Sequence, residues 1–227
     1  MNYEQARFNM IEQQIRPWEV LDSQVLSLLA LVRREDFVPA ARKSLAFADM
    51  EIPLTAKPGQ TMLAPKVEAR MLQDLAVQKH EKVLEIGTGS GYMAALLAHR
   101  GQQVISMEID ADLAQMARDN LKKSGVYNAE VRTGDGASRL GQAVSSNDPL
   151  SGPFDVIVLS GSVAEVPPAL LAMLKIGGRL GAIVGFKPMM RATLVTRVGE
   201  SDFHTTQNWD TVAARLLNFP EPSKFNF

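Results

Sequence analysis

The sequence predicts an α/β fold in which helices surround a mostly parallel sheet. From residue 82 onward, short apolar runs alternate with helical patterns, which is typical of β-α-β units. A glycine-rich turn at residues 87–91 joins the first apolar run to a helical pattern. Two apolar runs near the end of the chain have no helix between them, so we expect an antiparallel pair at one edge of the sheet. The C-terminal two-thirds therefore predict a Rossmann-like sheet.

The first part of the chain predicts helices followed by a loop. Apolar residues recur at helical spacing before Pro17 and again after Asp22, a good helix N-cap. Residues 36–65 hold several prolines and no sustained period, so we expect an ordered loop that lies over a neighbouring surface. A third helix is expected at residues 66–75. We therefore predict two parts: helices and a loop covering the substrate and cofactor at residues 1–78, and a Rossmann-like domain at residues 79–227.

The main domain is expected to alternate strands with helices. The expected strands are residues 83–86, 104–108, 129–133, 154–159, 179–184, 192–198 and 203–209, and the expected helices are residues 92–99, 113–123 and 169–174.

Composition excludes several classes of function. The 227 residues contain 24 Lys plus Arg, 25 Asp plus Glu and no cysteine. Nearly balanced charge gives no long-range attraction to nucleic acid or to an acidic membrane, so neither is an expected partner. Without cysteine, and with three histidines at no metal-ligand spacing, no disulfide or metal site is expected. No apolar run resembles a secretory signal or approaches the roughly 20 residues of a membrane span, so we expect a soluble, cytoplasmic protein.

The glycine turn carries the strongest functional signal. Bare backbone at the start of a helix can approach a ligand closely. The spacing Gly87-x-Gly89-x-Gly91 differs from the Gly-x-Gly-x-x-Gly of dinucleotide binders and resembles motif I of methyltransferases. By themselves, these glycines are weak evidence, because they could also form a tight turn between a strand and a helix without a ligand. The residues assigned to the cofactor here are Glu85, Gly87, Thr88, Gly89, Ser90 and Gly91.

Two acidic residues extend this signal. Glu108 ends the second expected strand, where a carboxylate can accept hydrogen bonds from both hydroxyls of a ribose, and Ile109 is assigned to the same site. Gly134-Asp135-Gly136 follows the third strand, where methyltransferases commonly place a carboxylate beside the adenine amino group. Gly-Asp-Gly is also ordinary turn chemistry. The order and spacing of the three motifs together favour an S-adenosyl-L-methionine site.

Several segments, spread from about residue 25 to about residue 198, resemble the protein-L-isoaspartate O-methyltransferase family. They are residues 33–39, 48–49 and 52–54, the start of the substrate motif at Gly59-Gln60-Thr61, residues 85–92, Gly134-Asp135-Gly136, Phe154-Asp155 and residues 174–178. The resemblance implies the class I methyltransferase strand order 3-2-1-4-5-7-6, S-adenosyl-L-methionine as cofactor, and a protein or peptide substrate that carries L-isoaspartyl or D-aspartyl residues. The oligomeric state stays open.

The chain departs from the family pattern in its substrate motif. Where the family has a serine two residues after the motif's threonine, this chain has Leu63, and residues 213–217 are only a loose counterpart of the family's Val-Arg-Phe-Val-Pro segment. A carboxylate acceptor is ionised at neutral pH and needs alignment more than a general base. Thr61 is therefore the candidate for orienting it, and Leu63 marks the position of the missing hydroxyl.

Three alternatives stay open at this point. One is a methyltransferase of the same descent that modifies a small molecule or one particular protein. The second, a nicotinamide-dependent oxidoreductase, is disfavoured by the glycine spacing. The third is a non-catalytic S-adenosyl-L-methionine-binding module. Residues 159–162 lack the Asn/Asp-Pro-Pro-Tyr/Phe run of many amino-group methyltransferases, which favours an oxygen acceptor. Met189 and Met190, beside Arg191, are expected in a loop or the core, with a substrate mouth as the second interpretation.

Overall fold

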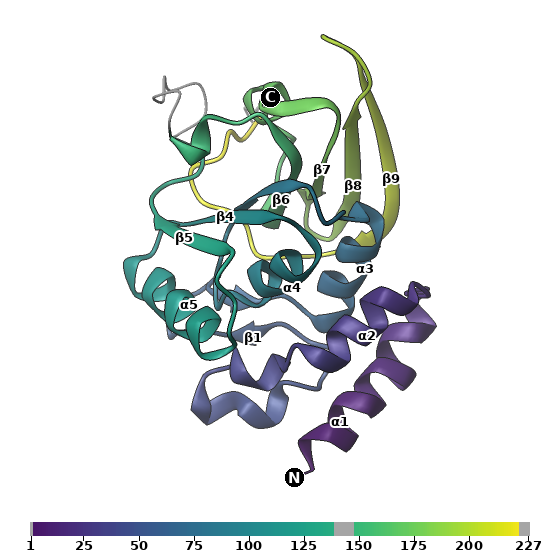
Figure 1. Ribbon diagram of the computed structural model, residues 1–227, viewed down its shortest axis with the longest axis vertical. Coiled ribbons are helices and arrows are strands. Elements are labelled where there is room, and N and C mark those ends of the chain that lie inside the picture. Colours follow the sequence, from purple (N-terminus) through teal and green to yellow (C-terminus); the bar gives the residue numbers. More distant parts are fainter. Residues whose placement is uncertain (1, 139–147, 223–227) are drawn as a thin grey trace, which may run out of the picture.

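The computed structural model describes residues 2–138 and 148–222 (Figure 1). Within these residues, seven strands form one mixed sheet and two short strands form another. The main sheet contains β3 (Lys82–Ile86), β4 (Gln103–Glu108), β5 (Ala129–Thr133), β6 (Phe154–Val163), β7 (Leu174–Phe186), β8 (Met189–Arg197) and β9 (Phe203–Thr211). Across the sheet, the order is β5-β4-β3-β6-β7-β8-β9. The α/β class is confirmed.

The expected order of the last two strands is wrong. Numbered along the chain, the seven strands of the sheet lie in the order 3-2-1-4-5-6-7. The first five are parallel, and β8 and β9 pair antiparallel with their neighbours, as expected for an edge pair. Only Lys187 and Pro188 lie between β7 and β8. A two-residue connection joins adjacent antiparallel strands and cannot cross over an intervening strand, so β8 must lie next to β7.

Helices connect the strands of the sheet where the sequence predicts them. They are α4 (Tyr92–Arg100), α5 (Ala111–Lys123) and α6 (Pro168–Ala172). Asp110 caps α5, since its Oδ1 accepts hydrogen bonds from the backbone N–H groups of Asp112 and Leu113. The last helix ends earlier than expected because Leu174 already belongs to β7.

The N-terminal part combines helices with a small hairpin. Its elements are α1 (Tyr3–Met10), which runs into a π turn (Ile11–Ile15) and a 3₁₀ turn (Arg16–Trp18), α2 (Ser23–Leu31), the 3₁₀ turns Arg34–Asp36 and Ala40–Leu45, β1 (Ile52–Pro53), β2 (Thr61–Met62) and α3 (Pro65–Leu75). Figure 1 shows α1 and α2 at one end of the molecule and the tip of β8 and β9 at the other. No helix among the described residues is long and apolar enough to cross a membrane.

The core lies on both faces of the sheet. Because side chains alternate along a strand, Val83 faces one buried cluster and Leu84 faces the other. The first cluster also contains Met10, Leu29 and Leu72, so the N-terminal helices share a core with the sheet. The division of the chain at residues 78 and 79 stays a prediction.

Candidate active site

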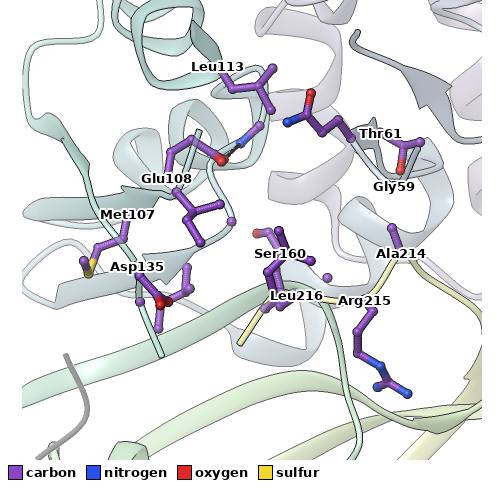
Figure 2. Close-up of a pocket in the computed structure, with 18 of the residues that line it drawn as sticks. Gly59, Thr61, Met107, Glu108, Leu113, Asp135, Ser160, Ala214, Arg215 and Leu216 are labelled. Atoms are coloured by element: carbon purple, nitrogen blue, oxygen red, sulfur yellow. Dashed lines mark hydrogen bonds between the residues drawn. The ribbon is translucent and has the colours of Figure 1, made fainter. Parts of the chain in front are cut away.

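A pocket opens at the carboxyl ends of β3, β4, β5 and β6, the edge at which parallel sheets bind ligands. Figure 2 shows Glu108 and Asp135 on one side of this central pocket and Thr61 on the other. Nine of the residues assigned from the sequence line it: Thr61, Leu63, Gly87, Gly89, Glu108, Ile109, Gly134, Asp135 and Gly136. The structure therefore brings the three cofactor motifs and the substrate motif together. The other four, Glu85, Thr88, Ser90 and Gly91, do not line the pocket.

The glycine turn requires glycine for two physical reasons. Gly87, Gly89 and Gly91 have φ angles of 96°, 55° and 86°, a region that side chains with a Cβ rarely adopt. A Cβ on Gly91 would lie 3.2 Å from the Cβ of Ala117, so this glycine lets α4 approach α5 closely. A Cβ on Gly87 would lie 2.8 Å from Cδ2 of Leu216, at the wall of the pocket. Two of the glycines therefore shape the pocket, and the third serves helix packing.

Glu108 is nearly buried at the end of β4. Its Oε2 accepts a hydrogen bond from the backbone N–H of Gly89 at 2.8 Å, and its Oε1 accepts one from that of Asp110 at 3.0 Å. Each carboxylate oxygen has a further lone pair, so Glu108 can accept additional hydrogen bonds from a ligand in the pocket. The same contacts join the glycine turn to the end of β4.

A buried polar network supports the glycine turn on the side away from the pocket. Glu85 is fully buried and accepts hydrogen bonds from the hydroxyls of Ser106 and Ser160, both at 2.6 Å. The hydroxyl of Thr88 lies 2.6 Å from that of Ser106. Burial raises the pKa of Glu85 from 4.5 to about 7, although the two hydroxyl hydrogen bonds act in the opposite direction. Glu85 and Thr88 thus hold the turn in shape and do not face the pocket.

Asp135 connects the Gly-Asp-Gly turn to the C-terminal segment. Its Oδ1 accepts a hydrogen bond from the backbone N–H of Ala137 at 2.9 Å, and its Oδ2 accepts one from the side-chain amide of Asn218 at 2.8 Å. A Cβ on Gly136 would lie 2.5 Å from Cγ2 of Ile86, so this turn packs directly on the end of β3.

The opposite wall comes from β2 and the residues after it. The hydroxyl of Thr61 lies 3.4 Å from Oε2 of Glu51, which is an acceptor for its proton. Leu63 is buried, and its carbonyl oxygen accepts a hydrogen bond from Nη2 of Arg34 at 2.6 Å. Arg34 is itself completely buried and forms an ion pair with Glu68. The position at which the family resemblance predicts a hydroxyl thus presents an apolar side chain to the pocket.

The loop before β2 is tied to the end of β4. Nζ of Lys57 and Nε2 of Gln60 both donate to Oδ2 of Asp110, at 2.6 and 2.9 Å. The hydrogen bond from Lys57 is the main cause that keeps the pKa of Asp110 well below its usual value, and the hydrogen bond from Gln60 is the next. These contacts connect the covering loop, expected from the sequence, to the cofactor side of the pocket.

The C-terminal segment supplies wall residues that were not assigned to the site, although residues 213–217 were compared with the family's Val-Arg-Phe-Val-Pro segment. Ala214, Arg215, Leu216, Leu217 and Phe219 line the pocket, as do Ser160 and Gly161 of β6. The segment is held by backbone hydrogen bonds, from the N–H of Ser162 to the oxygen of Ala214 (2.7 Å) and from the N–H of Leu216 to the oxygen of Ser162 (2.9 Å). Figure 2 shows the side chain of Arg215 directed away from Glu108. The position of Ser160 in the fourth parallel strand could have indicated that it lies at the pocket, since ligands bind at the carboxyl ends of such strands. No feature of the sequence indicates that Phe219 lies there.

Residues outside the pocket were also assigned from the sequence. Met189, the first residue of β8, is 81% exposed, whereas Met190 is buried. In the part of the chain that the structure describes, no group of three or more His, Asp or Glu could hold a metal ion. The expectation of no metal stays a prediction.

These features define a Rossmann-like enzyme of the methyltransferase class: a parallel sheet with a glycine turn after its first strand, a carboxylate at the end of its second and a Gly-Asp-Gly turn after its third. The model of the protein-L-isoaspartate(D-aspartate) O-methyltransferase family matches residues 5–212. The chain belongs to this family, which confirms the resemblance found in its motifs.

Individual relatives agree with this assignment. A Koribacter versatilis protein-L-isoaspartate O-methyltransferase is 40% identical over 191 residues, 84% of this chain and 81% of the relative. Protein-L-isoaspartate O-methyltransferase 1 of Syntrophobacter fumaroxidans is 38% identical and covers 90% of this chain and 91% of its own. A Plasmodium falciparum structure of such a methyltransferase in complex with S-adenosyl-L-homocysteine has a TM-score of 0.75 at 19% identity, with 95% of this chain and 98% of that chain covered. At this identity, the similarity to the Plasmodium falciparum structure shows a shared fold.

Proposed function

We propose that this protein is an S-adenosyl-L-methionine-dependent carboxyl O-methyltransferase that acts on L-isoaspartyl and D-aspartyl residues of damaged proteins. The observation that carries the proposal is the central pocket, in which the family's cofactor motifs face its substrate motif. The family match and the names of the relatives support the same activity. Nothing in the site favours the oxidoreductase or the non-catalytic module.

The residues present fit the cofactor. Gly87 and Gly136 present bare backbone to the pocket, at positions where a Cβ would collide with Leu216 or Ile86, and Glu108 has lone pairs free for two ribose hydroxyls. We assign direct contacts to Gly87, Gly89, Glu108, Ile109, Gly134, Asp135 and Gly136, and a supporting role to Glu85, Thr88, Ser90 and Gly91. When bound, S-adenosyl-L-methionine supplies an electrophilic methyl group on a positively charged sulfur. Glu108 and Asp135 would position the nucleoside, and the glycine turn lets the backbone approach it.

The acceptor side needs to orient a carboxylate. The substrate carboxylate has an intrinsic pKa of roughly 4, so it is already ionised and its oxygen can attack without a general base. Thr61 and neighbouring backbone N–H groups are the proposed orienting groups, and Leu63 excludes water at the position of the family's serine. We further propose that the protein acts in the cytoplasm and on proteins, not nucleic acid, in keeping with its nearly balanced charge.

A methyl-acceptance assay tests the proposal. A short peptide with a central isoaspartyl residue is compared with the same peptide carrying an ordinary aspartyl residue, with labelled S-adenosyl-L-methionine as donor. We expect transfer to the first peptide and none to the second. If S-adenosyl-L-methionine binds in calorimetry but neither peptide is methylated, the acceptor assignment is wrong and a diverged methyltransferase is the better account. Absence of cofactor binding would overturn the cofactor assignment itself.

A further inference from the structure

A second hollow begins where the acceptor side of the central pocket ends. This side groove has a volume of about 590 Å³, within the range of ligand-binding sites, and lies between the β1 side of the hairpin, the start of β8 and the end of β9. The residues that matter for its chemistry are Glu51, Lys66, Met189, Arg191, Asp210 and Val212.

The side groove is continuous with the central pocket along the chain. Val212 lines the groove and Ala214 lines the pocket, while Leu63 lines the pocket and Ala64 lines the groove. Glu51 lies at the boundary, because it lines the groove and its Oε2 is 3.4 Å from the hydroxyl of Thr61. The hairpin pairs Ile52 with Met62, so the next pair in this register places Glu51 opposite Leu63. A peptide with its acceptor carboxylate at Thr61 would therefore have its neighbouring residues at the groove.

The charges of the groove leave one carboxylate without a counterion. Nζ of Lys66 pairs with Asp49 at 2.8 Å, and Arg191 pairs with Asp210 at 3.1 Å. Glu51 has no ion pair among the described residues, and its Oε1 is buried without a hydrogen-bond donor. Oδ1 of Asp49 is buried in the same way. A buried carboxylate oxygen without a donor is unfavourable, so a ligand that brings an N–H group would be stabilised there.

The walls of the groove are apolar on the side of the strands. Met189 is 81% exposed and Val212 is 46% exposed, and both line the groove. An aliphatic side chain with a charged end fits such a surface, because its stem packs on apolar atoms while its head reaches a polar group. Apolar walls combined with an unpaired carboxylate favour lysine or arginine over an acidic side chain.

We propose that the side groove binds the residue next to the isoaspartyl residue of the substrate, and that Glu51 selects a lysine or arginine there by accepting its N–H hydrogen bonds. The inference rests on the proposed function, since it assumes that a peptide reaches the central pocket from this side. Glu51 is a specificity-determining residue and takes no part in the transfer of the methyl group.

The test uses hexapeptides that differ only in the residue beside the central isoaspartyl residue: Lys, Ala or Glu, on the N-terminal side in one series and on the C-terminal side in another. In at least one series, we expect the wild-type kcat/KM for the Lys peptide to exceed that for the Glu peptide about tenfold, the size of one charge-assisted hydrogen bond. In Glu51→Gln, the ratio should fall below about twofold, and affinity for S-adenosyl-L-methionine should stay unchanged.

Two further variants sharpen the test. Glu200→Gln removes the same charge from the exposed connection between β8 and β9, at the opposite end of these strands, and should keep the wild-type preference. Met189→Ser shortens the apolar wall. The factor by which it raises KM should be about three times larger for the Lys peptide than for the Ala peptide. Equal kcat/KM for the Lys and Glu peptides in both series, or a wild-type preference in Glu51→Gln, would overturn the proposal.

Peptide binding separates this proposal from the proposed function. Binding of the same peptides to protein saturated with S-adenosyl-L-homocysteine can be measured by calorimetry without turnover. If the Lys peptide binds more tightly than the Glu peptide and Glu51→Gln removes this difference, the groove proposal is supported. If no methyl group is transferred in that case, only the methyl-transfer assignment is wrong. Equal binding of the Lys and Glu peptides overturns the groove, whether or not methylation occurs.

Discussion

The two walls of the central pocket are built in different ways. The cofactor wall consists of backbone at the ends of paired strands: β3 pairs with β4 from Lys82 to Ile86, and the N–H of Gly87 then donates to the carbonyl of Met107 at 2.9 Å. The acceptor wall consists of two-residue strands, and side-chain contacts tie its loop to the rest of the molecule. The first wall is therefore determined by the register of the sheet, and the second by a few individual side chains.

This difference predicts where the specificity of the site can change. A change in a backbone-built wall disturbs the path of the chain, so few residues are tolerated there. A change in a side-chain wall alters what is recognised and leaves the path intact. Leu63 belongs to the acceptor wall, and Glu51 contacts Thr61 of that wall from the side groove, so the specificity for the acceptor can change while the cofactor site stays the same. Four variants test this contrast.

Gly89→Val should have the largest effect, on the cofactor wall. Gly89 has a φ of 55°, and a Cβ there would lie 3.2 Å from Cδ1 of Leu54, so a branched side chain both strains the turn and fills the pocket. We expect no measurable binding of S-adenosyl-L-methionine in calorimetry. Gly125→Val is the matched control, because Gly125 has a φ of 72° and open space around it. Normal binding by a folded Gly89→Val protein would mean that the motif is only a turn.

Glu108→Ala should weaken S-adenosyl-L-methionine binding by about 1–3 kcal/mol, because the ribose loses charge-assisted hydrogen bonds and the glycine turn loses its anchor at the N–H of Gly89. Calorimetry on the folded variant measures the change. Glu130→Ala, on the exposed face of the neighbouring β5, removes the same charge outside the pocket and should bind as the wild type does. Unchanged affinity in Glu108→Ala would refute the assignment of the ribose site.

Leu63→Ser tests the acceptor wall and should raise kcat/KM on isoaspartyl peptides roughly tenfold to a hundredfold, equivalent to about 1.4–2.7 kcal/mol from one hydrogen bond in the transition state. Cofactor affinity should barely move. Leu63→Ala creates a similar space without a hydroxyl, so it separates the hydrogen bond from the loss of the buried side chain. Equal activities of the Ser and Ala variants would show that the hydroxyl contributes nothing here.

Glu85→Gln should have the smallest effect on the two walls, since Glu85 does not line the pocket, and should change stability instead. The pKa of Glu85 is about 7 in the folded protein and near 4.5 when unfolded, so folding takes up a proton between these pH values. The ionisation of Glu85 therefore lowers the free energy of unfolding increasingly as pH rises from 4.5 to 7, and this loss is constant above pH 7. Relative to wild type, Glu85→Gln should gain roughly 2–3 kcal/mol of unfolding free energy at pH 8 compared with pH 5, since about two pH units at about 1.4 kcal/mol each lie between pH 5 and the folded-state pKa. Denaturant unfolding at both pH values measures this, and a difference independent of pH would contradict it.

Local patterns predicted the elements of the sheet well. Each expected strand of the main domain overlaps an observed one, because period-two and period-3.6 patterns depend only on residues near in sequence. Assigning the strand order from the family resemblance failed at β8 and β9, where the two-residue link after β7 contained the decisive information. Glu85 was grouped with the cofactor contacts because it precedes the glycines, yet its side chain points to Ser106 and Ser160.

The sequence by itself determined the α/β class, the glycine turn, the strand-end position of Glu108 and the apolar substitution at Leu63, since each depends on residue type and on spacing within one segment. The tertiary structure alone decided how the substrate side is assembled. It brings Glu51 to Thr61 through the hairpin, places residues 214–219 against the pocket, and leaves Oε1 of Glu51 without a donor. Residues 214–219 are far in sequence from the motifs they meet, and no local pattern encodes which residues will come together.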